Sequence, residues 1–126
     1  MRAALALIVA AAGFGAMAAS AAAPEPARFQ VSSTEFRLTL SRSSVPAGPV
    51  IVELYNRGED DHDLALRRLG KGAVTRRIGI VHPGRAADLE TQLSPGTFVL
   101  WCTLADHRAR GMHATLVVRA RGAKTR

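Results

Sequence analysis

Short apolar runs, each of strand length, follow one another along most of the chain, with turn signals between them. In "FQVSSTEFRLTL" the apolar positions alternate around Phe36, Leu38 and Leu40, which is the two-residue period of a half-buried strand. Later runs are "VIVELYN", "LALRRL", "RIGIV", "ADLETQL", "TFVLWC" and "ATLVVRA", and the breaks include "SVPAGP", "GKG", "HPG" and "SPG". No segment keeps a 3.6-residue period with helix caps. The pattern predicts an all-β fold of seven to eight short strands, an antiparallel sandwich or barrel.

The first residues have a different character. "MRAALALIVAAAGFGAMAASAAAPEP" has one positive residue, an apolar run and small residues that end in the A-x-A sequence at 19–21. This predicts a secretory signal peptide over 1–21 and a short linker over 22–27. The alternative is an uncleaved anchor, but Gly13 and Gly15 interrupt the run and favour cleavage. We therefore expect export to the periplasm or the cell exterior, with membrane association only if the segment is retained.

Length and charge restrict the remaining chain. With 126 residues, the sequence has room for one domain, over 28–120, and a basic tail over 121–126. The net charge of +7 suggests an acidic partner or an anionic membrane surface, although it also serves solubility. Nucleic acid fits poorly with an exported protein. We expect a monomer that meets redox partner proteins and has no stable membrane span once the signal is cleaved.

Cys102 is the only cysteine of the chain. It cannot form a disulfide within its own chain, and a free thiolate outside the cytoplasm is open to oxidation unless it is buried or bound to a metal. Three interpretations follow: an inert core residue, an intermolecular disulfide partner or a metal ligand.

Four residues favour the ligand interpretation. Cys102, His107 and Met112 belong to one predicted strand–loop–strand, and His62 precedes the "LALRRL" strand. Each residue alone is more often a core or surface residue, but together they form a donor set of two imidazoles, a thiolate and a thioether. That set is typical of a type 1 copper site. Structural zinc prefers four strong donors, and iron–sulfur clusters generally need more cysteines. We predict one copper ion that cycles between Cu(I) and Cu(II).

The segments "NRGEDDHDL", "SPGTFVLWCTLADHRARGM" and "HATLVV" resemble those of the cupredoxins, a family of small blue copper proteins that includes plastocyanin, azurin and rusticyanin. The resemblance implies a Greek-key β-sandwich. It also implies that His62, Cys102 and His107 are equatorial ligands, that Met112 is the axial ligand, and that His107 is the electron port. The spacing of Cys102, His107 and Met112 is like that of rusticyanin but leaves the subfamily open.

The sequence departs from many cupredoxins at Asp63, where an asparagine commonly follows the first histidine. We predict that Asp63 accepts a hydrogen bond from Thr103 and that its charge lowers the reduction potential. Leu104 and Ala105 form a small apolar patch near the predicted port. Two arginines complete the candidate docking surface or are plain solvent-facing charges; they are Arg108 and Arg110.

The predicted function is transfer of single electrons between redox proteins. The alternative is a copper carrier or buffer that delivers the ion to an oxidase. An enzyme is disfavoured, because copper oxidases and nitrite reductases need a second copper site with further histidines, and this chain has four in total. The two histidines outside the site, His82 and His113, are predicted to lie at the surface.

Overall fold

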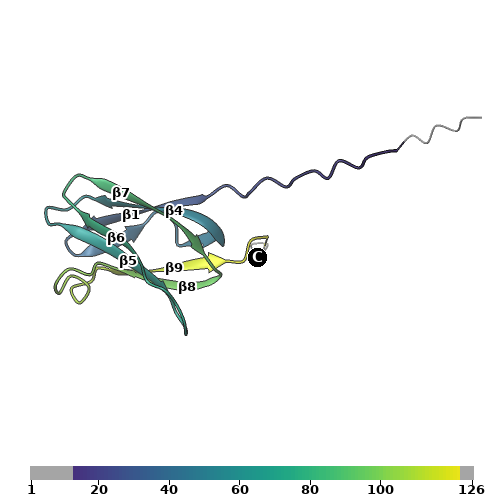
Figure 1. The fold of residues 1–126 in the computed structure, drawn as a ribbon. Helices are drawn as coiled ribbons and strands as arrows, with labels where there is room; N and C mark the ends of the chain where they lie inside the picture. The colour runs from purple at the N-terminus through teal and green to yellow at the C-terminus, as the bar shows by residue number, and fades with distance from the viewer. Residues whose placement is uncertain (1–12, 123–126) are drawn as a thin grey trace, which may run out of the picture.

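The computed structural model describes residues 13–122 and consists there of nine strands in two packed sheets (Figure 1). One sheet has the order β2-β1-β4-β7. Its strands are β2 (Arg37–Leu40), β1 (Ala27–Thr34), β4 (Gly48–Asn56) and β7 (Ala86–Leu93). The other sheet has the order β3-β9-β8-β5-β6. Its strands are β3 (Ser44–Pro46), β9 (His113–Arg119), β8 (Gly96–Trp101), β5 (His62–Arg68) and β6 (Arg76–Val81).

The all-β prediction is confirmed, with three corrections to its details. The strand expected across residues 29–40 is a hairpin, in which β1 and β2 pair antiparallel around a turn at Glu35 and Phe36. The alternation continues through this turn, and no glycine or proline marks it, so the pattern could not locate it. The predicted break "SVPAGP" contains β3. The strands are also not all antiparallel, because β1 pairs with β4 and β3 pairs with β9 in parallel.

The core lies between the two sheets and follows the alternation of the strands. Along β8, Phe98 and Leu100 are buried, whereas Val99 and Trp101 are partly exposed on the outer face. Full burial of such a side chain stabilises the fold by about 1.5–3 kcal/mol. Cys102 and Met112 belong to the same buried cluster as these residues. The core therefore continues without a break into the loops at one end of the sandwich.

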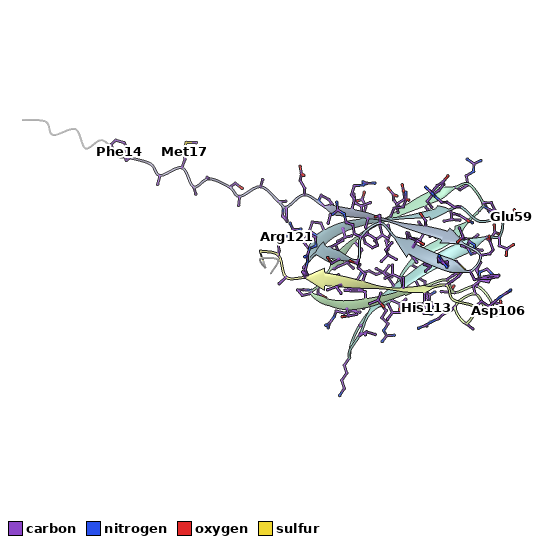
Figure 2. All side chains as sticks on the ribbon, turned by 180° about the vertical axis from the view of Figure 1, so that it is seen from behind. Phe14, Met17, Glu59, Asp106, His113 and Arg121 are labelled. Atoms are coloured by element: carbon purple, nitrogen blue, oxygen red, sulfur yellow. The ribbon has the colours of Figure 1, made fainter. Side chains whose placement is uncertain are left out.

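The two ends of the sandwich carry different segments. Residues 13–26 have no regular secondary structure and lead away from the body as an extended segment (Figure 1). Figure 2 shows Arg121 near that segment, and Glu59 and Asp106 at the opposite end. In residues 13–122 there is no helix that is long and apolar enough to cross a membrane. The apolar run at 3–12, on which the signal prediction depends, lies outside the described residues, as do residues 123–126 of the predicted tail.

Candidate metal centre

Three of the four predicted ligands meet at the end of the sandwich marked by Glu59 and Asp106 in Figure 2. The ligand atoms of His62, Cys102 and His107 all lie within 4.8 Å of one another. His62 begins β5, Cys102 directly follows β8, and His107 lies in the loop between β8 and β9. Atoms at this separation can bind a single metal ion, so the fold brings together residues that are 40 positions apart in the sequence.

The position of Cys102 follows from the alternation of β8. Phe98 and Leu100 face the core, and Cys102 is the next residue on that face, with no exposed surface. Its N–H donates to the carbonyl of Met112 at 3.1 Å, which extends the pairing of Trp101 with His113 by one position. Met112 is fully buried as well, and its N–H donates to the carbonyl of His107 at 3.1 Å. Backbone bonds thus tie Met112 to the two ligands that precede it.

The loop between Cys102 and Met112 is a series of tight turns. Asp106 has a positive φ of 56°, and the N–H groups of His107 and Arg110 donate to carbonyls three to four residues earlier. Gly111 has a φ of 122°, and a Cβ at this position would lie 2.9 Å from the carbonyl oxygen of Phe36. The loop therefore closes against the β1–β2 turn at a point where only glycine fits.

His62 has one free nitrogen. Its side chain is fully buried, and Nε2 lies 2.8 Å from Glu35 Oε1. Its Nδ1 is buried and has no hydrogen-bond partner among the described residues. A buried polar atom without a partner costs about 1–3 kcal/mol, so it calls for a further group. The Cys102 Sγ and the His107 Nδ1, 3.5 Å apart, are the neighbouring donors, and a soft metal ion suits this set.

Burial raises the pKa of the Cys102 thiol, and the carboxylate of Asp63 acts in the same direction. Both effects disfavour a negative charge on sulfur in the metal-free protein. The thiolate is the form that binds metals, and a metal cation supplies the positive charge that stabilises it. Metal binding at this thiol would therefore release its proton, and the backbone N–H groups of Asp63 and Leu104, which act to lower its pKa, would favour the thiolate.

Asp63 joins β5 to the residue after Cys102. One of its oxygens accepts from the Thr103 N–H at 2.6 Å, and the other accepts from the Thr103 hydroxyl. The predicted hydrogen bond is present, together with a backbone bond that the sequence did not reveal. Because Ala65 pairs with Trp101, these bonds extend the contact between β5 and β8 toward the metal centre.

Two residues at the site were not predicted. Phe36 packs edge-on against His107, with ring centroids 5.1 Å apart, and the Arg110 guanidinium lies 3.7 Å from its ring centroid. Glu35 holds His62, and its pKa is lowered to about 2, chiefly by the hydrogen bond from the Asp60 N–H. The sequence carried no signal for either residue, because both appeared to continue a strand.

The other predicted residues lie around this end of the molecule. Leu104 is half-buried and Ala105 exposed, and both line a hollow with Trp101, whose ring carries the guanidinium of Arg108 at 4.6 Å. Arg108 and Arg110 are exposed. His113 is exposed, and His82 is exposed and pairs with Asp61 at 2.7 Å. The latter two histidines lie at the surface, as predicted.

Comparison with known proteins reveals likeness of structure only. No family model and no curated sequence matches the chain. A reduced auracyanin from the photosynthetic bacterium Roseiflexus castenholzii is 16% identical, with a TM-score of 0.62 over 76% of this chain and 99% of that chain. Auracyanin A, a "blue" copper protein from Chloroflexus aurantiacus, is 13% identical, with a TM-score of 0.61 over 75% and 100%. Rusticyanin from Thiobacillus ferrooxidans is 14% identical, with a TM-score of 0.61 over 77% and 79%.

Larger proteins share the same architecture. A copper nitrite reductase from Nitrosomonas europaea is 17% identical, with a TM-score of 0.56 over 79% of this chain but 44% of that chain. A multicopper oxidase matches over a similar part of its length, 44%. The auracyanins and rusticyanin match over most of their length. The chain therefore has the fold of small copper proteins, which larger copper enzymes also contain.

Proposed function

We propose, from the cupredoxin fold of the chain and its cluster of His62, Cys102 and His107, that this protein binds one copper ion and transfers single electrons between redox proteins. The observation that carries the proposal is the buried Nδ1 of His62, which has no partner within residues 13–122 and lies in the same cluster as a buried thiol and a second imidazole. Copper supplies the one-electron chemistry when bound. Zinc, the main competitor for this donor set, would supply none.

Each ligand has a distinct part in the proposal. His62 Nδ1, Cys102 Sγ and His107 Nδ1 would be the strong donors. Met112, buried and tied by its backbone to Cys102 and His107, would be the weak fourth donor. The bonds of Asp63 to Thr103 and the packing of the β1–β2 turn on His107 would hold the donors in one arrangement for both oxidation states. A small rearrangement between those states favours fast electron transfer.

Exposure supports an electron path through His107. His62, Cys102 and Met112 are fully buried, whereas His107 is only partly buried. A partner that docks over Leu104 and Ala105 would approach this ligand most closely. We expect an exported protein whose positive charge, to which Arg108 and Arg110 in this loop contribute, speeds encounter with acidic redox partners.

The alternative function is a copper carrier that delivers the ion to an oxidase. A carrier must release its metal, and three fully buried ligands argue for retention. Catalysis of the kind that copper oxidases and nitrite reductases perform would need a second copper site. Among residues 13–122, His62, Cys102 and His107 form the one group of His, Cys, Asp or Glu side chains whose ligand atoms could share a metal ion. Electron transfer is therefore the function that the geometry supports best.

The test begins with the absorption spectrum of the full chain after addition of Cu(II). We expect an intense thiolate-to-copper band in the visible region that disappears in Cys102→Ala. His82→Ala is the control for loss of an imidazole: His82 is exposed, pairs with Asp61 beside His62, and is not one of the three clustered residues, so the variant should keep the band. A colourless protein that binds only zinc would refute the proposal.

A second measurement separates electron transfer from copper delivery. The loaded protein is mixed with chelators selective for Cu(I) and for Cu(II), and loss of the metal is followed in both oxidation states. An electron carrier should retain copper in both states and exchange electrons rapidly with a partner. Ready loss of copper in both oxidation states would favour the alternative function, copper delivery. Rate constants with an acidic partner should fall as salt rises if charge steers the encounter.

A further inference from the structure

We infer that Glu35 is a positioning residue of the metal centre: it orients His62 and holds the reduction potential down through its negative charge. The inference rests on the proposed copper site. It concerns a residue 27 positions before His62, at the tip of the β1–β2 hairpin.

Glu35 Oε1 is the centre of three hydrogen bonds. It lies 2.8 Å from His62 Nε2, and it accepts from the N–H groups of Glu59 at 3.0 Å and of Asp60 at 2.9 Å. The Glu35 side chain is 26% exposed, whereas the imidazole it holds has no exposed surface. The carboxylate therefore closes the solvent side of the His62 ring.

This contact selects the tautomer of His62. An ionised carboxylate can only accept hydrogen bonds, so Nε2 carries the proton that it donates, and in the neutral imidazole Nδ1 then carries the lone pair. Nδ1 is the nitrogen that is buried without a partner among residues 13–122. Glu35 thus leaves free the atom that the metal requires, before any metal is present. Carboxylates that hold metal-binding histidines in this manner also make the imidazole a stronger donor.

The surrounding loop is built to hold the carboxylate in place. Asn56 fastens the loop from inside: its side chain accepts from the Gly58 N–H at 2.8 Å and donates to the carbonyls of Asp60 at 2.7 Å and Val81 at 2.8 Å. A Cβ at position 58 would overlap the Glu35 carboxylate. The loop therefore has a glycine where the carboxylate lies against it.

The negative charge of Glu35 should change the relative stability of the two oxidation states of copper. A carboxylate hydrogen-bonded to a ligand stabilises the more positive oxidation state, so it favours Cu(II) over Cu(I). A neutral acceptor at the same place would hold the ring but would lack this effect. The two parts of the role can therefore be separated by substitution.

The experiment compares Glu35→Gln and Glu35→Ala with the control Glu59→Gln in the full chain. Glu59 is an exposed neighbour, and only its backbone bonds to Glu35. Potentials are measured by voltammetry, and affinities for Cu(I) and Cu(II) by competition with chelators. In Glu35→Gln we expect about a tenfold loss of Cu(II) affinity relative to Cu(I), which is a rise of about 59 mV for a one-electron couple. Glu59→Gln should keep the wild-type potential, and a Glu35→Gln potential equal to that of the wild type would overturn the charge effect.

A readout without metal tests the positioning. In the metal-free protein, nitrogen NMR should show the His62 proton on Nε2 in the wild type and a mixture of tautomers in Glu35→Ala. If Glu35→Ala does not fold, Glu35→Gln supplies the comparison, and in it the Nε2 proton should persist. An Nε2 proton that persists unchanged in folded Glu35→Ala would overturn the positioning role. If the wild type binds no copper, the proposed function is refuted. If Glu35→Ala nevertheless loses the tautomer preference of His62, the positioning role stands.

Discussion

Gly111 offers a test of how the loop between Cys102 and Met112 closes against the β1–β2 turn. It directly precedes Met112, has a φ of 122°, and would place a Cβ 2.9 Å from the carbonyl oxygen of Phe36. Gly111→Ala therefore has two costs. One is a backbone conformation that residues with a Cβ rarely adopt, and the other is overlap with a backbone atom that cannot rotate away.

A second glycine separates the two costs. Gly70 has a similar φ of 114°, but a Cβ there would meet no atom within 4 Å. Gly70→Ala should therefore lower the free energy of unfolding by the backbone cost alone, about 1–3 kcal/mol. Overlap in a packed region typically adds about 1–3 kcal/mol. Gly111→Ala should thus be the more destabilised of the two by that second amount.

Denaturant unfolding of both variants and the wild type measures the difference, with equal m-values as the condition for comparison. In the copper-loaded proteins, the visible spectrum should change in Gly111→Ala, because the Phe36 carbonyl belongs to the turn that contacts both His107 and His62. Gly70→Ala should keep the wild-type spectrum. Equal destabilisation of the two variants would refute the claim that the loop closes tightly on the β1–β2 turn.

Three further predictions concern charge, pH and the metal. Asp63→Asn replaces charge-assisted bonds to Thr103 with neutral ones, so it should cost about 1 kcal/mol in urea unfolding and raise the reduction potential in voltammetry; unchanged values would contradict this role. The pKa of Glu35 falls from 4.5 to about 2 on folding. The contribution of the ionised Glu35 to the free energy of unfolding is therefore complete above pH 4.5 and disappears as the pH falls toward 2. The difference in unfolding free energy between the metal-free wild type and Glu35→Gln should therefore shrink across that window, and a constant difference would count against it. Free copper at about 100 times its Kd should stabilise the wild type by about 2.7 kcal/mol in thermal unfolding and Cys102→Ala much less, whereas equal shifts would indicate binding elsewhere.

Local pattern was enough to predict most of the strands and the placement of the candidate ligands near strand ends. The alternation of "TFVLWC" places Cys102 on the same face as Phe98 and Leu100, and both neighbours prove to be buried. The residue types then indicated a soft metal site, which needed only the chemistry of the side chains. The bond between Asp63 and Thr103 was implied by the resemblance to cupredoxins, which commonly have an asparagine at that position.

Strand pairing was beyond the reach of that pattern, because alternation tells which face a residue occupies but not which strand lies beside it. The parallel pairing of β1 with β4, up to Ser33 and Asn56, brings the β1–β2 turn beside the loop before His62. Only this tertiary arrangement makes Glu35 a partner of His62 and Phe36 a neighbour of His107. The proposed donors could therefore be predicted from the sequence, whereas the residues that contact them, Glu35 and Phe36, were decided by the packing of distant strands.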